Sequence, residues 1–93
     1  MIDFTQRVVV PEDTLMRELE GESVLLNLAN EKYYGLNKVG TRMWAVLESS
    51  ASIQAAYDQL KAEYAVDPIR LRADLETLIE KLVKQGLVKL EKA

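Results

Sequence analysis

The stretch that decides the fold runs from residue 14 to residue 37 and reads TLMRELEGESVLLNLANEKYYGLN. It holds three apolar-rich runs, at residues 14–20, 23–28 and 32–36. Gly21 with Glu22 forms a connection short enough for a tight hairpin. Ala29-Asn30-Glu31 is the second connection, with Asn30 suited to positive φ. The stretch therefore predicts a three-stranded antiparallel meander.

Alternation of side chains along a strand assigns each residue to a face of this sheet. Val24, Leu26 and Leu28 alternate with Leu25 and Asn27, which predicts that the first three point into the core. In the last run Tyr34 and Leu36 share the core face. Leu25 and Tyr33 are then left on the opposite face.

After Asn37 the apolar period becomes helical. Asn37 is a suitable N-cap for a first helix, and Ser52 is a suitable N-cap for a second. The apolar positions expected to repeat on the two helices are Val39, Met43, Trp44 and Leu47, then Ile53, Ala56, Tyr57, Leu60 and Tyr64.

A third helix is expected from Asp67 as N-cap and Pro68 at the first helical position to about Gln85, with Gly86 as its C-terminal cap. On a helical wheel Leu75, Leu78 and Leu82 lie within about 40° of Leu71. Ile79 and Val83 lie further round, at about 80° and 120° from Leu71. The apolar arc is about 140° wide, broader than one contact with a core requires.

The two ends of the chain carry weaker strand signals. Val8-Val9-Val10 before Pro11 favours an extended segment, and residues 87–90 could form a short final strand. The whole pattern predicts one α+β domain over residues 1–93, with its core at about 14–90. It is similar to a winged helix-turn-helix in which a three-stranded antiparallel sheet comes first and three helices follow.

Composition excludes most enzyme classes. The chain has 93 residues, a net charge of −3, no cysteine and no histidine. Disulfides, thiol nucleophiles and the commonest metal ligands are absent, and no hydroxyl has a histidine to activate it. No glycine-rich phosphate-binding motif occurs. We therefore expect no catalytic residue, no metal and no cofactor, and an enzyme is the least favoured class.

Charge and hydropathy limit the partners and the location. Residues 1–31 hold seven acidic and two basic residues, whereas residues 32–93 hold eight acidic and ten basic ones. No run is apolar enough to span a membrane, and the N-terminus lacks the features of a secretory signal, so a cytoplasmic protein is expected.

The last strand of the meander, residues 32–36, is expected at a sheet edge, and such an edge can accept another strand. Two readings of Tyr33 stay open. It could pack on Leu25 as an ordinary cross-strand pair. Alternatively, Tyr33, Leu25 and the Ile79/Val83 flank of the third helix could line a groove in which an extended peptide pairs with the edge. An open edge could also pair with a second copy, so a monomer or weak dimer is expected.

Several segments together resemble a known family. They are residues 21–28 (GESVLLNL), residues 33–40 (YYGLNKVG) with Met43-Trp44, and the later run Asp74-Leu75, Leu78-Ile79, Leu82 and Gly86-Leu87-Val88. The order and spacing resemble the PqqD-like proteins, also called RiPP precursor-peptide recognition elements, over residues 14–90.

The resemblance implies the sheet-first winged-helix fold and a non-catalytic function. In that family the leader of a ribosomally made precursor peptide adds as an antiparallel strand to the third strand and packs against the third helix. Carried onto this sequence, the pairing strand is Glu31, Lys32, Tyr33, Tyr34, Gly35 and Leu36. The groove candidates are Leu25, Tyr33, Leu75, Leu78, Ile79 and Val83, with Arg72 and Asp74 as polar anchors. The wheel favours the Ile79/Val83 flank, while Asp74 lies on the other.

The subtype is also implied by resemblance. Family members of quinone-cofactor biosynthesis typically carry Pro-Glu after the second strand, where this chain has Ala29-Asn30. The Tyr-Tyr-x-Leu-Asn run at residues 33–37 is more similar to lasso-peptide recognition proteins, which act beside a leader peptidase and an ATP-dependent macrolactam synthetase. The alternative is a PqqD-type peptide chaperone that works with a radical SAM enzyme.

A winged-helix DNA-binding protein is a more distant alternative. It would need a basic recognition helix, but the third helix balances Arg70, Arg72, Lys81 and Lys84 against Asp74, Glu76 and Glu80. This near-balance argues against nucleic acid as a partner.

Overall fold

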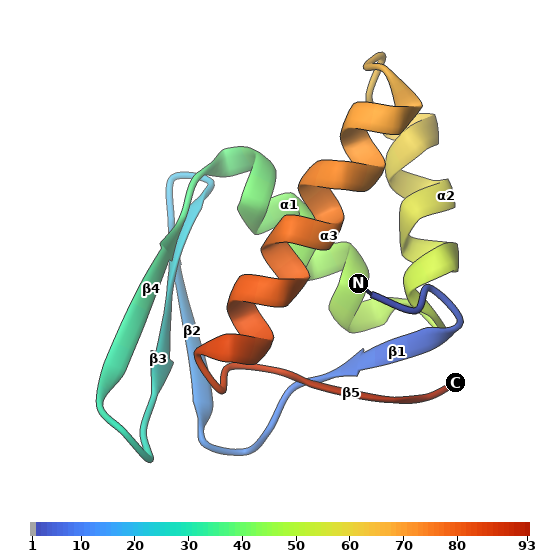
Figure 1. Ribbon diagram of the computed structural model, residues 1–93. Helices are drawn as coiled ribbons and strands as arrows, with labels where there is room; N and C mark the ends of the chain where they lie inside the picture. Colours follow the sequence, from blue (N-terminus) through green and yellow to red (C-terminus); the bar gives the residue numbers. More distant parts are fainter. Residues whose placement is uncertain (1) are drawn as a thin grey trace.

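The structure is a computed structural model that describes residues 2–93. Three strands form an antiparallel sheet in the order β2-β3-β4, and three helices follow (Figure 1). This confirms the predicted α+β fold with its sheet first. The bounds are β1 Gln6–Val9, β2 Thr14–Leu19, β3 Glu22–Asn27, β4 Lys32–Leu36, α1 Lys38–Ser49, α2 Ile53–Glu63, α3 Pro68–Lys84 and β5 Lys89–Lys92.

The two turns of the meander use residues one place away from those predicted. Glu20 and Gly21 adopt φ of 55° and 85°, so they form the two-residue turn, and Glu22 already belongs to β3 opposite Leu19. Two successive positive φ values match the right-handed twist of a hairpin. In the second turn Glu31, with φ 61°, takes the left-handed conformation expected of Asn30. The Asn30 side chain instead accepts a hydrogen bond from the Lys32 amide at 2.9 Å.

The predicted core face of β3 is wrong. Leu25 is completely buried, while Val24 is 45% exposed and Leu28 50% exposed. The buried partners of Leu25 along the strand are polar: Ser23 and Asn27.

Hydrogen bonds explain why polar side chains can occupy that face. The Ser23 and Thr41 hydroxyls lie 2.8 Å apart. Asn27 Nδ2 donates to the carbonyl oxygens of Gln85 and Gly86 at 3.3 and 3.1 Å. A buried polar group that is hydrogen-bonded avoids most of the cost of leaving water.

The helices begin where their capping residues predict. Asn37 accepts from the Gly40 amide, Ser52 from the Ala55 amide and Asp67 from the Ile69 amide, at 2.8, 3.1 and 2.9 Å respectively. The apolar stripes of the three helices meet in one core together with Leu25 and Leu36. Val39 is the exception, because it is exposed on the first turn of α1.

A second, two-stranded sheet joins the ends of the chain. β1 pairs antiparallel with β5, with Gln6 opposite Lys92 and Val9 opposite Lys89 (Figure 1). The final strand begins at Lys89, later than predicted, where the register with β1 ends at Val9; Leu87 and Val88 before it are buried in the core. None of the helices in residues 2–93 has the length and hydropathy needed to cross a bilayer.

Candidate peptide-binding edge

β4 forms an edge of the three-stranded sheet. Its residues, Lys32–Leu36, pair on one side with β3, and within residues 2–93 no strand pairs with the other side (Figure 1). Such an edge presents backbone donors and acceptors that a further strand can use. The observed strand begins at Lys32, so Glu31 lies in the preceding turn rather than in the pairing segment.

The side chains of β4 divide between the two faces of the sheet. Tyr34 and Leu36 point to the core side, as predicted, with Tyr34 half-buried and Leu36 buried. Tyr33 and Gly35 belong to the outer face, and Tyr33 is 75% exposed. The register places Tyr33 opposite Leu26 and Tyr34 opposite Leu25. Tyr33 and Leu25 thus lie on opposite faces, so neither the predicted Tyr33–Leu25 pair nor a groove lined by both residues is formed.

One flank of α3 faces the N-terminal segment. The Arg72 guanidinium carbon lies 3.8 Å from the centre of the Phe4 ring, and the Ile2 amide donates to Glu76 at 3.4 Å. Ile79 and Val83 share this flank because they follow at helical spacing. Ile79 is completely buried and Val83 is 40% exposed. The flank favoured by the helical wheel is therefore turned away from β4, and Arg72 is already stacked on Phe4.

The other flank of α3 lies toward the sheet edge. Asp74, Leu78, Lys81 and Gln85 follow one another at helical spacing on it. The Gln85 carbonyl contacts Asn27 on β3, which is the strand next to β4. Asp74 and Lys81 are exposed, whereas Leu78 is almost buried and Leu75 completely so. Of the predicted groove residues, Leu25, Leu75 and Ile79 present no surface to a ligand in this structure.

A hollow of about 420 Å³ lies at the N-terminal end of this second flank. It is bounded by the first turns of α1, the segment between α2 and α3, and the start of α3. Its lining residues are Val39, Met43, Tyr64, Val66, Asp67, Arg70, Leu71 and Asp74. Of these, only Asp74 was expected at the site. The sequence pattern assigns Val39 to the buried stripe of the first helix, so nothing in the sequence marks it as a surface residue of this hollow.

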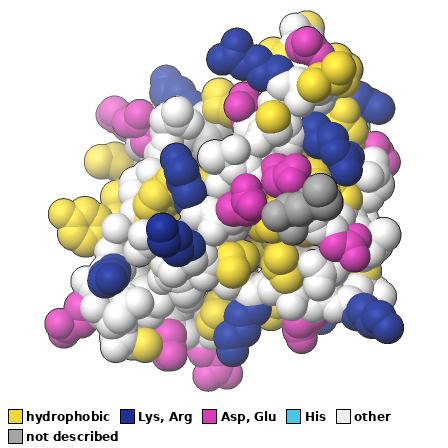
Figure 2. Space-filling model, in the orientation of Figure 1, with side chains coloured by type: hydrophobic (Ala, Val, Ile, Leu, Met, Phe, Trp, Pro, Cys, Tyr) yellow, Lys and Arg dark blue, Asp and Glu magenta, His cyan; other side chains and the backbone are white. Residues whose placement is uncertain are grey.

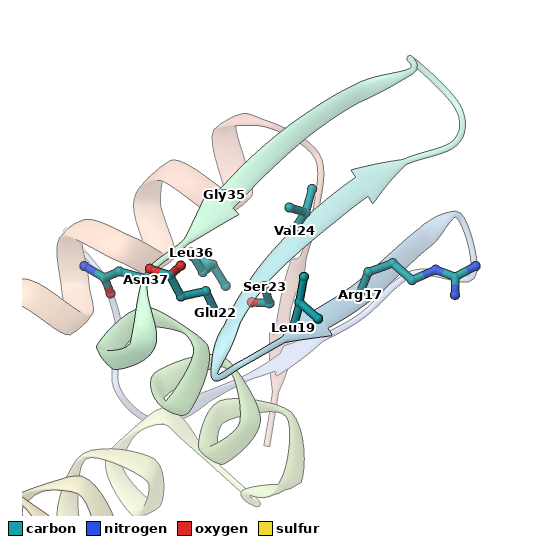
Figure 3. Close-up of a pocket in the computed structure, with 8 residues that line it drawn as sticks. All are labelled: Arg17, Leu19, Glu22, Ser23, Val24, Gly35, Leu36 and Asn37. Atoms are coloured by element: carbon teal, nitrogen blue, oxygen red, sulfur yellow. The ribbon is translucent and has the colours of Figure 1, made fainter.

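A second, more open hollow of about 620 Å³ lies around the β2–β3 turn, beside the C-terminal end of β4. Figure 3 shows Val24 next to Gly35, with Leu19 and Arg17 on β2, across β3 from Gly35. A Cβ atom at Gly35 would meet nothing within 4 Å, so the missing side chain helps to leave this surface hollow. Exposed apolar residues cover much of the outer face: Leu15, Leu19, Val24 and Tyr33.

The titratable side chains of residues 2–93 include one ion pair with a clearly displaced pKa. Within residues 2–93 no group of three or more acidic side chains is placed to hold a metal ion. The largest displacement is at Glu63, where hydrogen bonds from Arg42 and then Gln59 lower the pKa to about 2. This carboxylate joins α2 to α1 through Arg42, at 2.8 and 2.6 Å, so its low pKa has a structural cause.

These features define a class: a sheet-first α+β domain with an open strand edge beside its third helix. The family model for coenzyme PQQ synthesis protein D (PqqD) matches residues 22–88. The chain belongs to the PqqD family, which confirms the resemblance found in the sequence.

A solved structure is also similar to this chain. It is described as TbiB1 in complex with the TbiA(beta) leader peptide. The two chains are 30% identical, with a TM-score of 0.80, over 87% of this chain and 94% of that one. A comparison with curated proteins finds no significant match.

Proposed function

We propose that this protein is a non-catalytic recognition element that binds the leader region of a ribosomally synthesised precursor peptide. The leader adds to β4 as an antiparallel strand and packs against the Asp74–Lys81 flank of α3. The observation that carries the proposal is the open edge of β4 in a chain that is 30% identical to a protein solved with a leader peptide. Backbone pairing supplies affinity, and side-chain contacts supply specificity.

The proposed binding surface includes some of the site residues expected from sequence. Lys32, Tyr33, Tyr34, Gly35 and Leu36 form the pairing strand. Tyr33 meets the leader on the outer face, as the cross-strand neighbour of one leader residue. On the inner face the contacts come from Asp74 and the exposed edge of Leu78.

The first test is a fluorescence-polarisation titration with a labelled leader peptide, taken from the precursor encoded beside this chain. Single backbone N-methylations are introduced along the leader. Successive backbone groups of an added strand alternate between facing β4 and facing away. We expect about tenfold weaker binding at every second position and little change between them. A loss without this two-residue period would contradict strand addition.

Tyr33→Ala should weaken leader binding by about three- to fivefold, because one cross-strand pair is lost. Val83→Gln is the matched control, since Val83 lies on the flank that faces the N-terminal segment. We expect its affinity to stay within about twofold of wild type. A stronger effect at Val83 than at Tyr33 would place the leader on the other side of α3.

The partners are proposed from the same resemblance. We propose that the protein delivers the leader-bound precursor to a leader peptidase and an ATP-dependent macrolactam synthetase of lasso-peptide biosynthesis, in the cytoplasm. Its exposed apolar outer face supports contact with a further protein, since such patches commonly mark interaction sites. Bringing precursor and enzyme together raises their effective concentration.

The second candidate is a PqqD-type peptide chaperone that works with a radical SAM enzyme, favoured by the PqqD family match. The two candidates differ in the enzyme that the leader complex binds. Pull-down of the leader complex with each purified enzyme class distinguishes them.

A further inference from the structure

The strand edge and the third helix bring basic side chains together at one end of the proposed binding site. Lys32, the first residue of β4, lies opposite Asn27 in the β3–β4 register. Asn27 Nδ2 donates to the Gln85 and Gly86 carbonyls, just beyond the last turn of α3. The start of β4 and the C-terminal end of α3 are therefore neighbours. Lys32 shares the sheet face of Tyr34 and Leu36, so its side chain leaves β4 on the side where α3 lies.

The last turn of α3 adds two further lysines to this end. Lys81 and Lys84 are both exposed, and Lys81 lies on the flank turned toward β4. In Figure 2 Lys and Arg side chains gather between α3 and the sheet, in the left half of the molecule. In residues 2–93 none of the three lysines takes part in an ion pair. Close in sequence to these lysines are two acidic residues: Glu31, in the turn before Lys32, and Glu80, which lies about 100° round the helix from Lys81 and one turn before Lys84.

The opposite end of the site has a different character. The hollow near the start of α3 has apolar walls, including Val39, Met43 and Leu71, with Asp67 and Asp74 at its rim. Arg70 is already paired with Asp74, at 3.8 Å. The site is thus basic beside Lys32, whereas the hollow beyond Leu36 is mainly apolar and has Arg70 together with two carboxylates.

A strand added antiparallel to β4 has a fixed direction across this gradient. It enters beside Leu36 and leaves beside Lys32, because β4 itself runs from Lys32 to Leu36. We propose that the leader carries a carboxylate side chain at the C-terminal end of its bound segment, held by Lys32 and Lys81, with Lys84 adding to the local field. This inference rests on the proposed function and specifies it: the acidic residue orients the leader and sets its register on β4.

The test uses the labelled leader and two variants of it. In one variant Asp and Glu in the C-terminal half of the bound segment become Asn and Gln, and in the other the same change is made in the N-terminal half. Exposed ion pairs contribute modestly, up to about fivefold in Kd each. We therefore expect the C-terminal change to weaken binding about tenfold at low salt, and the N-terminal change to leave it within about twofold.

The protein variants complete a double-mutant cycle. The double variant Lys32→Gln/Lys81→Gln should bind the wild-type leader about tenfold more weakly than the unmodified protein does. Its affinity for the C-terminally neutralised leader should be unchanged. Lys89→Gln, on β5, is the matched control and should change neither. Equal losses for both peptides, or no loss for either, would overturn the carboxylate subsite while leaving strand addition intact. No binding of the unmodified leader to the unmodified protein would instead overturn the proposed function.

Discussion

At the scale of single residues, Asn27 connects the binding edge to the helical layer. Its side chain is buried, its Nδ2 group donates to two carbonyls beyond α3, and its Oδ1 accepts from the Ala29 amide at 2.9 Å. The same residue lies opposite Lys32 on β4. One amide side chain therefore fixes the C-terminal end of α3 beside the strand that is proposed to receive the leader.

Replacing this residue should cost stability. Asn27→Ala removes all three hydrogen bonds and leaves the Gln85 and Gly86 carbonyls without that donor, so we expect a loss of about 2 kcal/mol in the free energy of unfolding. Urea denaturation followed by the fluorescence of Trp44, the single tryptophan, measures it. Asn30→Ala, which removes one exposed hydrogen bond, is the control and should cost less than about 1 kcal/mol. Equal losses would mean that Asn27 does not fasten the helix end.

At the scale of elements, an ion pair joins α1 to α2. Arg42 Nε and Nη2 donate to the two carboxylate oxygens of Glu63, at 2.8 and 2.6 Å, and Gln59 Nε2 donates to the same carboxylate at 3.1 Å. These donors lower the pKa of Glu63 to about 2, and the same pair raises the pKa of Arg42. Since α1 also carries residues of the hollow beside α3, this pair helps to hold one wall of the site.

The lowered pKa gives the pair a defined pH dependence. A carboxyl whose pKa is about 2 when folded and near 4.5 when unfolded stabilises the fold above pH 4.5. That contribution disappears as the pH falls from 4.5 toward 2, because the unfolded state takes up its proton first. Glu63→Gln and Arg42→Gln should each lose less stability than wild type over this range. Urea midpoints at pH 2 to 7 measure it, and parallel curves for all three proteins would contradict the assignment.

The elements also differ in how far the sequence predicts them. Helix starts are local: Asn37, Ser52 and Asp67 each bond an amide two or three residues ahead, so the capping signal is contained in the chain segment itself. The face of β3 is not local. A period of two cannot distinguish Val24 and Leu26 from Leu25 and Asn27 unless the distant partners of Asn27 are known. Those partners, Gln85 and Gly86, are brought to it only by the complete fold.

The same error carried into the candidate site. Placing Leu25 on the outer face puts it beside Tyr33, whereas the Ile79/Val83 flank is favoured by the wide apolar arc of the helical wheel. The pairing strand itself needed no such information, because residues 32–36 end the meander and an end strand has one free side. Which flank of α3 is left open depends on the N-terminal segment, which is distant in sequence. Phe4 and Ile2 contact the flank that carries Arg72 and Glu76.

At the scale of the whole molecule, the chain ends close the core outside the segment matched by the PqqD family. β1 and β5 pair with each other, and Phe4 is buried just before β1. The Phe4 ring lies edge-on to Tyr57 at 6.1 Å and under Arg72, and its carbonyl accepts from the Gln54 amide at 2.9 Å. The N-terminal segment thus supports α2 and α3 from the side opposite β4 (Figure 1).

This arrangement separates stability from leader binding. Phe4→Ala should lower the free energy of unfolding by about 3 kcal/mol, because a buried aromatic ring is lost from between two helices. Urea denaturation measures the loss. At a temperature where circular dichroism shows the variant fully folded, its affinity for the labelled leader should stay within about twofold of wild type, since the ring lies on the flank of α3 turned away from β4. Tyr33→Ala should behave in the opposite way, with little change in unfolding and weaker binding. A Phe4→Ala protein that is folded but fails to bind would show that the N-terminal segment shapes the binding site as well as the core.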